Sequence, residues 1–121
     1  MTAQSNLRVH EEDGSIFVEF APDAERVGGR SIRMVLDFNS TGEVIGIEII
    51  NLVFKAGKKS LDIINQFVPI KGELPRYSYD QDSDSFYLRL KADRSLDQKA
   101  LDGSMFLDRE GRINALSAKW K

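Results

Sequence analysis

Acidic residues in the second half of the chain are its clearest candidates for chemistry. Residues 80–84 (DQDSD) alternate carboxylates as a calcium loop does, and such oxygens are the hard ligands that Ca²⁺ prefers. The rest of the loop is missing, because Ser85 stands where the turn needs glycine and Lys91 where the bidentate glutamate should be. We therefore predict no metal site and interpret the run as a solvated turn whose aspartates bond nearby amides.

A second set of side chains could bind a cationic group, since carboxylates beside a phenol hold arginines or small cations through charge-assisted hydrogen bonds. The candidate partner- or ligand-binding residues are Glu48, Asp80, Asp84, Tyr87 and Asp108. The alternative is structural: Asp37 and Asp108 each close an expected strand before a turn and would hold that turn together. Gly46, on the same strand face as Glu48, leaves room that is either a pocket or a close strand crossing.

Other catalytic chemistry has little support in the sequence. The one histidine, His10, has neither a cysteine nor a second histidine to work with. The pair Gly28-Gly29 lacks the spacing and the strand-loop-helix context of a phosphate-binding loop. We predict no cofactor and no catalytic residue, and the sequence does not favour an enzyme.

Composition limits the possible partners. The chain has 121 residues, no cysteine, 30% charged residues and a net charge of -2, which suits one soluble domain without disulfides. This charge gives no strong nucleic-acid signal, and we interpret the lysines at positions 55, 58, 59 and 71 as a solvated face. Without an apolar run of about 18 residues we expect no membrane span, and a cytoplasmic location.

An internal repeat organises the elements that must position these residues. Residues 15–20 (SIFVEF) recur as 85–90 (SFYLRL) at an offset of 70, and Phe17 and Tyr87 take equivalent outward positions. Residues 34–37 (MVLD) align with 105–108 (MFLD) at an offset of 71 (34 to 105), and Gly42 with Gly111 at 69. The chain therefore reads as two copies of one unit.

Each copy predicts a small antiparallel β-meander, because its apolar residues alternate with period two and its turns carry glycine. Expected strands are 7–10, 16–20, 32–37 and 44–50, then 76–79, 86–90, 105–108 and 113–118. One short helix is expected at 61–67, capped by Ser60 and ended by Pro69. The predicted class is α+β, mainly antiparallel β: two tandem meanders related by a pseudo-twofold and joined by that helix.

The domain prediction follows from this. Residues 1–6 form a flexible tail, and 7–121 form a single domain of repeat one (7–54), a helical connector (55–75) and repeat two (76–121). One unit of about 45 residues is marginal alone, so we expect a pseudo-dimeric monomer or a weak homo-oligomer.

The motifs resemble a bacterial and archaeal family of small domains of unknown function. The second copy carries its tyrosine-aspartate start, aspartate and apolar-tyrosine-apolar strand (YDQDSDSFYLRL, from Tyr79), and the first carries its glycine-x-apolar-apolar-glycine-apolar-glutamate strand (GEVIGIE, from Gly42). Each copy departs where the other matches: His10 and Gly14 replace Asp80 and Asp84, and Ala115 and Ser117 replace Gly46 and Glu48. The resemblance implies a sheet-rich, non-catalytic domain, and an antitoxin partner in a toxin gene pair for some members.

The sequence thus predicts a non-enzymatic binding or protein-interaction module, in an antitoxin-like role. The alternative is a small-ligand or cation-binding domain that uses an acidic cleft between the repeats, with Glu48 from one copy and Asp80 or Asp84 from the other.

Overall fold

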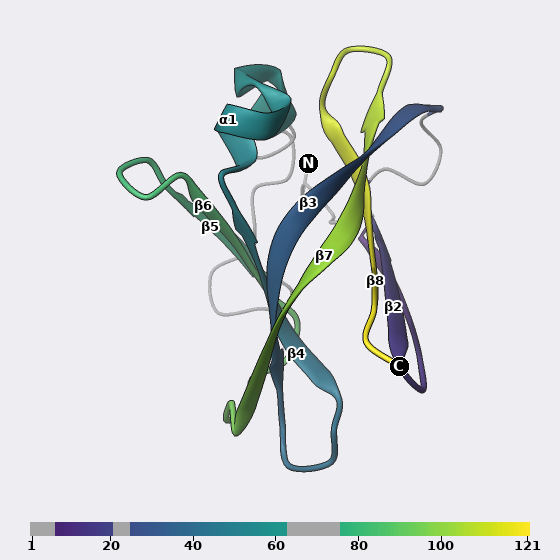
Figure 1. Cartoon of the computed structure of the whole chain (residues 1–121), viewed down its shortest axis with the longest axis vertical. Coiled ribbons are helices and arrows are strands. Elements are labelled where there is room, and N and C mark those ends of the chain that lie inside the picture. The colour runs from purple at the N-terminus through teal and green to yellow at the C-terminus, as the bar shows by residue number, and fades with distance from the viewer. Residues whose placement is uncertain (1–6, 21–24, 63–75) are drawn as a thin grey trace, which may run out of the picture.

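The protein is a strongly curled antiparallel sheet with a short helix at one end (Figure 1). The computed structural model describes residues 7–20, 25–62 and 76–121. Its elements are β1 (Arg8–Glu12), β2 (Ser15–Glu19), β3 (Arg26–Phe38), β4 (Val44–Ile50), α1 (Leu52–Ala56), the 3₁₀ helix η1 (Lys58–Leu61), β5 (Arg76–Asp80), β6 (Ser85–Arg89), β7 (Asp97–Asp108) and β8 (Ile113–Lys119). The predicted class, α+β and mainly antiparallel β, is confirmed. No helix of this described part is long and apolar enough to cross a bilayer.

The strand order is symmetric: β1-β2-β8-β7-β3-β4-β6-β5. Exchanging β1–β4 with β5–β8 gives the same order read backwards, so the centre of the sheet is the pairing of β3 with β7. This pairing runs from Arg26 opposite Asp108 to Phe38 opposite Asp97. The order has the twofold relation that the repeat predicts, whereas an ancestral duplication stays a hypothesis.

Neighbouring strands differ from the expected meander at one place in each half. β2 pairs with β8 instead of β3, and β6 pairs with β4 instead of β7. Each half therefore contributes two hairpins, and its first hairpin is paired with the second hairpin of the other half. Apolar periodicity decides which face of a strand is buried but leaves its neighbour open, which is why the sequence missed this exchange.

The turn after β3 corrects the alignment of the two halves. Asn39 Oδ1 accepts the amides of Thr41 and Glu43 at 3.1 and 2.9 Å, and Asp108 Oδ1 accepts those of Glu110 and Arg112, both at 2.9 Å. Asn39, not Asp37, is thus the counterpart of Asp108, at an offset of 69 (39 to 108). The sequence alignment was wrong by two residues because a two-residue slip keeps every side chain on its face.

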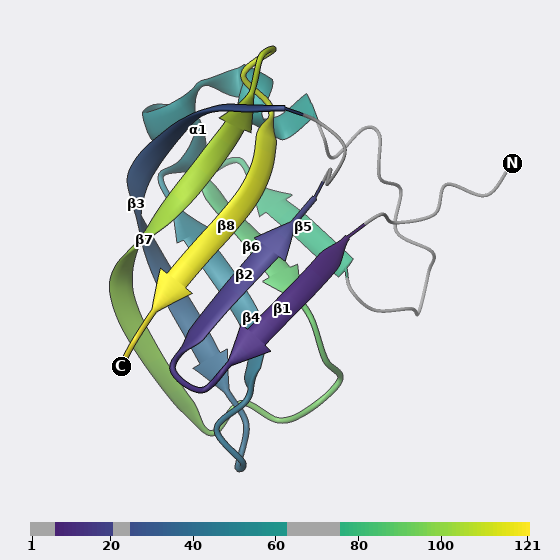
Figure 2. The ribbon, with the colours of Figure 1, turned by 90° about the vertical axis from the view of Figure 1, so that its right-hand side faces the viewer.

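The core fills the inside of the curl. In Figure 2, β8, β2 and β1 form the near wing, while β4, β6 and β5 form the wing behind it. Phe20, directly after β2, meets Phe86 of β6 edge to face with ring centroids 6.1 Å apart, so the two wings touch across the interior. Fully buried side chains from both wings and the centre complete this core: Val18, Met34, Leu36, Ile47, Ile49, Leu88, Met105 and Leu116.

Helix α1 (Leu52–Ala56) was not predicted from the sequence. α1 follows β4 directly, and Ser60 lies within η1, where its hydroxyl donates to the Gly57 carbonyl at 2.6 Å. The predicted helix at 61–67 falls, except for its first two residues, outside the described residues. Pro69 and the greater part of the predicted connector also lie outside them.

Deleting residues 1–50 tests the exchanged hairpins. The deletion removes β3 and β4, which are all that links β6 to β7 within the sheet. We expect residues 51–121 to be unfolded as a monomer or to form a dimer that restores the strand order, as measured by far-UV circular dichroism and light scattering against the full chain. A folded monomer would contradict this topology.

Candidate functional site

The five candidate residues do not form one site. Glu48 and Tyr87 lie directly opposite each other on β4 and β6. Asp80 ends β5 and Asp84 lies in the following turn, whereas Asp108 ends β7. Glu48 thus lies on a different hairpin from Asp80 and Asp84, and the acidic cleft between them stays a prediction.

Asp84 caps helix α1 from another part of the chain. Its carboxylate accepts the amides of Val53 and Phe54 at 2.8 and 2.9 Å and the hydroxyl of Tyr79 at 2.6 Å. Burial disfavours the charged form, but these three donors outweigh it and hold the pKa of Asp84 below its ordinary value. Its backbone is left-handed, with φ of 52°, and its carbonyl accepts the amide of Asn51, which is also left-handed. Asp84 thus fixes α1 to the β5–β6 turn.

Asp80 and Asp108 stabilise their own turns. Asp80 accepts the amide of Asp82 at 3.1 Å and the hydroxyl of Ser83 at 3.0 Å. Asp108 also forms an ion pair with Arg112 at 2.8 Å; although burial opposes ionisation, the backbone and side chain of Arg112 keep the pKa of Asp108 below its ordinary value. Across the described ranges, no cluster of three or more histidine, cysteine or acidic side chains could hold a metal ion.

Tyr87 fills the space that Gly46 leaves open on the outer face of the sheet. Its hydroxyl donates to Asp37 Oδ2 at 2.9 Å, and Gln98 donates to Asp37 Oδ1 at 2.6 Å. A Cβ on Gly46 would lie 2.2 Å from the Tyr87 oxygen, so the glycine permits a close crossing and no pocket. Burial first, and then Asp37, raise the pKa of Tyr87, although Arg89 acts in the opposite sense. Asp37 therefore holds this crossing, and its predicted role in the turn was wrong.

In the other half the equivalent position is packed by ring contacts, with the Arg26 guanidinium 5.0 Å above the centre of the Phe17 ring. Phe17, the counterpart of Tyr87, packs edge to face on Phe106 with centroids 6.4 Å apart. Phe106 lies opposite Gly29 in the β3–β7 pairing, as Gln98 lies opposite Asp37. A Cβ on Gly29 would come within 3.1 Å of the Phe106 ring. Both outer clusters are thus packed and internally satisfied, which makes each of them a structural feature.

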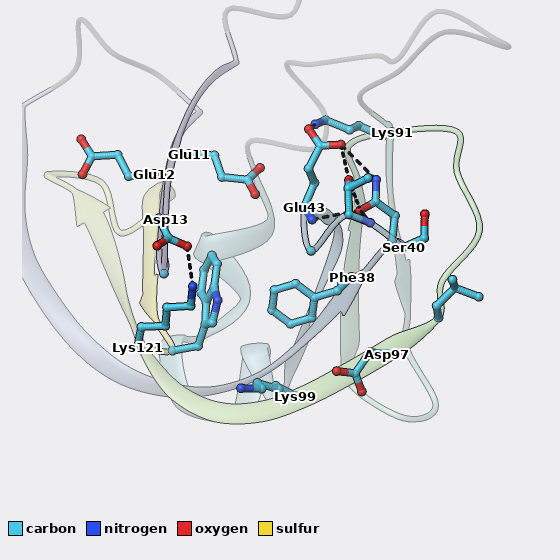
Figure 3. A pocket seen from close by; sticks show the side chains of 16 residues that line it. Glu11, Glu12, Asp13, Phe38, Ser40, Glu43, Lys91, Asp97, Lys99 and Lys121 are labelled. Carbon is cyan, nitrogen blue, oxygen red and sulfur yellow. Dashed lines mark hydrogen bonds and ion pairs between the residues drawn. The ribbon is translucent and has the colours of Figure 1, made fainter.

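A hollow that the sequence did not predict lies at the end of the molecule away from α1. This cleft, of about 820 Å³, lies between the β1–β2 turn, the β3–β4 turn, the start of β7 and the end of the chain (Figure 3). Both halves line it. Phe38 and Trp120 meet edge to face at its floor, with centroids 5.2 Å apart. Its rim carries five acidic and three basic side chains, namely Glu11, Glu12, Asp13, Glu43, Asp97, Lys91, Lys99 and Lys121.

Two ion pairs neutralise part of this rim. Lys121 bonds Asp13 at 2.5 Å and Lys91 bonds Glu43 at 2.6 Å. Lys91, together with Asn39 and Thr41, lowers the pKa of Glu43 to about 2, so that carboxyl is charged throughout the physiological range. Glu11 accepts the Val44 amide at 3.0 Å. Within the described chain, Glu11, Glu12 and Asp97 make no ion pair, and neither does Lys99, so three negative charges against one positive charge leave the rim with excess negative charge.

Sequence reasoning missed the cleft because its lining comes from four distant segments. The available signals were the only tryptophan and the acidic run at 11–13. Neither signal indicates that the two segments meet, because Trp120 reaches Gly14 only through the β2–β8 pairing, where its amide donates to the Gly14 carbonyl at 2.9 Å.

Comparison with known proteins adds no assignment: no family model, curated sequence or solved structure matches the chain. The resemblance to the family of unknown function therefore stays a prediction from its motifs. The candidate site rests on the geometry alone.

Substituting Gly46 tests the close crossing. Gly46→Ala places a methyl group against Tyr87 and should destabilise the fold by about 1–3 kcal/mol, the usual cost of overpacking. Gly28→Ala is the matched control, because a Cβ added there would meet no atom within 4 Å; its effect should stay within about 0.5 kcal/mol. Urea unfolding measures both, and equal effects would show that the crossing is not tight.

Asp84→Asn tests the helix cap, since asparagine tolerates the same left-handed backbone. At pH 7 we expect a loss of about 0.5–2 kcal/mol. Because folding lowers the pKa of Asp84, its ionised form stabilises the fold above the unfolded pKa of about 3.9, and that contribution disappears as pH falls through the folded pKa. The difference from the wild type should therefore shrink in acid. The control is Asp82→Asn, because the Asp82 carboxylate accepts no hydrogen bond from the described residues. If the loss of stability in Asp84→Asn did not depend on pH, the charged cap would be excluded.

Proposed function

We propose that this protein is a non-enzymatic binding module whose site is the cleft at the open end of the curled sheet. Its ligand is a basic side chain of a protein partner, with an apolar stem and a cationic head. The observation that supports this is an acidic rim above the Phe38–Trp120 floor, built jointly by the two halves.

The lining suits such a ligand physically. Lysine and arginine stems pack on apolar surfaces while their charged heads stay near water or over an aromatic ring. Trp120 offers that ring, and Glu12 and Asp97 offer carboxylates that no described cation neutralises. The ligand would thereby gain packing and charge pairing at the same position.

Binding fits this lining better than catalysis does. None of the residues that line the cleft is a histidine or cysteine, and the Thr41 hydroxyl already bonds Asn39 at 2.9 Å. The lining therefore lacks the histidine or cysteine that most often forms a nucleophile–base pair.

An antitoxin-like role is the most specific form of this proposal. The family resemblance suggests it, and the partner would then be a basic protein encoded by a neighbouring gene, met in the cytoplasm. The second candidate is a small amine or cation in the same cleft, favoured by a volume within the range of small-molecule sites.

The single tryptophan allows a direct test. Titrating a lysine-rich peptide should change Trp120 fluorescence saturably, and added salt should weaken the binding. Glu12→Gln and Asp97→Asn should each reduce affinity about two- to fivefold, as expected for partly exposed charge pairs. Glu110→Gln, an acidic residue outside the cleft, should leave it unchanged.

Two outcomes would count against peptide capture. An unaltered Trp120 emission spectrum at saturating peptide would show that the cleft is not the site. An equal loss of peptide affinity in Glu110→Gln would show that the affinity depends on the net charge of the protein and not on the cleft. A melting temperature raised by spermine but not by the peptide would support the small-amine candidate instead.

A further inference from the structure

We propose that the basic group taken up by the cleft is the α1–η1 end of a second copy of this chain, so that copies associate head to tail. This inference rests on the proposed function and places a second copy of this chain, instead of a protein encoded by a neighbouring gene, in the role of the basic partner. We call Arg30, Phe54, Lys55 and Lys58 the basic knob.

Phe54 is the most exposed large apolar residue among those the structure describes. Its side chain is 80% exposed, compared with 58% for Leu96 and 54% for Val27. Covering an exposed aromatic ring with a partner removes apolar surface from water and so lowers the free energy of the assembly. Phe54 is therefore the part of this surface that most favours association.

The knob is held rigidly at the end of the molecule. The amide of Phe54 itself donates to the Asp84 carboxylate at 2.9 Å, and Arg30 donates to the Lys55 carbonyl at 2.8 Å. Both contacts join α1 to strands or turns of the sheet. A ring on such a braced helix loses little conformational freedom on binding, which favours affinity.

The charges of the knob complement those of the cleft. Lys55 and Lys58 are exposed, and neither makes an ion pair with another described residue; the Arg30 guanidinium adds a third positive charge beside them. At the rim of the cleft, Glu12 and Asp97 lack such pairs; the Glu12 side chain points outward from the rim, away from Phe38 (Figure 3). An aromatic ring flanked by cations thus meets aromatic rings flanked by carboxylates.

The two surfaces lie at opposite ends of the long axis. Figure 1 shows α1 at one end and, at the other, the β3–β4 turn and the start of β7, which border the cleft. A contact between different surfaces is heterologous, so every open assembly keeps one free knob and one free cleft, and only a closed ring occupies all of them. Association should therefore continue beyond the dimer as concentration rises.

Complementation between two variants tests this arrangement. The knob variant carries Phe54→Ser and Lys58→Glu, and the cleft variant carries Glu12→Lys and Asp97→Lys. By sedimentation velocity we expect wild type to form dimers and larger species, and each variant alone to remain monomeric with its apparent Kd raised about tenfold or more. Mixed in equal amounts, the variants should form a one-to-one dimer and nothing larger, since one intact knob meets one intact cleft.

The matched control is Val27→Ser with Arg8→Glu, which also replaces an exposed apolar side chain by serine and reverses one positive charge, but away from the knob, and it should assemble as wild type does. Circular dichroism checks that all variants are folded. A wild type that stays monomeric at millimolar concentration, or a mixture without the dimer, would overturn the proposal. So would binding of phosphatidylserine vesicles through the knob by a monomeric wild type.

The knob variant also separates this inference from the proposed function. It keeps an intact cleft, so it should still bind the lysine-rich peptide by Trp120 fluorescence. If it binds the peptide while wild type does not associate, the second copy is the wrong partner and peptide capture stands. If it fails to bind, the cleft itself is not the site.

Discussion

The pairing of β3 with β7 is the constraint on which the rest of the structure depends. Each of these long strands also carries its own hairpin partner, β4 or β8, on its other edge. With both edges occupied, the first hairpin of each half cannot pair with the long strand that follows it, and it joins the sheet beyond the second hairpin of the other half instead. The exchange of hairpins follows from this, and it explains why neither half could bury its core alone: the contact between Phe20 and Phe86 needs both wings.

The outer face shows how two equivalent positions can be packed by different chemistry. On one side a phenol, a carboxylate and an amide form a closed hydrogen-bonded group above Gly46; on the other, two phenyl rings meet beside Gly29. A buried polar group is stable when every member finds a partner, and an aromatic pair needs none. Asp37 is therefore part of the packing, and an acidic side chain in the sequence does not by itself indicate a binding site.

The two ends of the curl differ in charge and shape, and the function proposed above rests on that difference. One end is covered by α1 and η1, which present lysines around an exposed phenylalanine. The other is left open, with acidic side chains around a floor of Phe38 and Trp120. Because the sheet is curled, residues from four segments converge at the open end, and a concave surface forms without any dedicated binding loop.

The sequence by itself determined the fold class, the faces of the strands and the glycine-containing turns, because period-two alternation and turn chemistry act over a few residues. It also placed Phe17 and Tyr87 in equivalent positions. It could not decide which strands are neighbours, because partner choice depends on closing the sheet around a shared core. The same limit applies to Asp84, which caps a helix 30 residues away, and to the cleft, whose aromatic floor and acidic rim meet only once β2 lies beside β8. Only the tertiary structure decided these features, since each is a contact between segments that the chain itself keeps far apart.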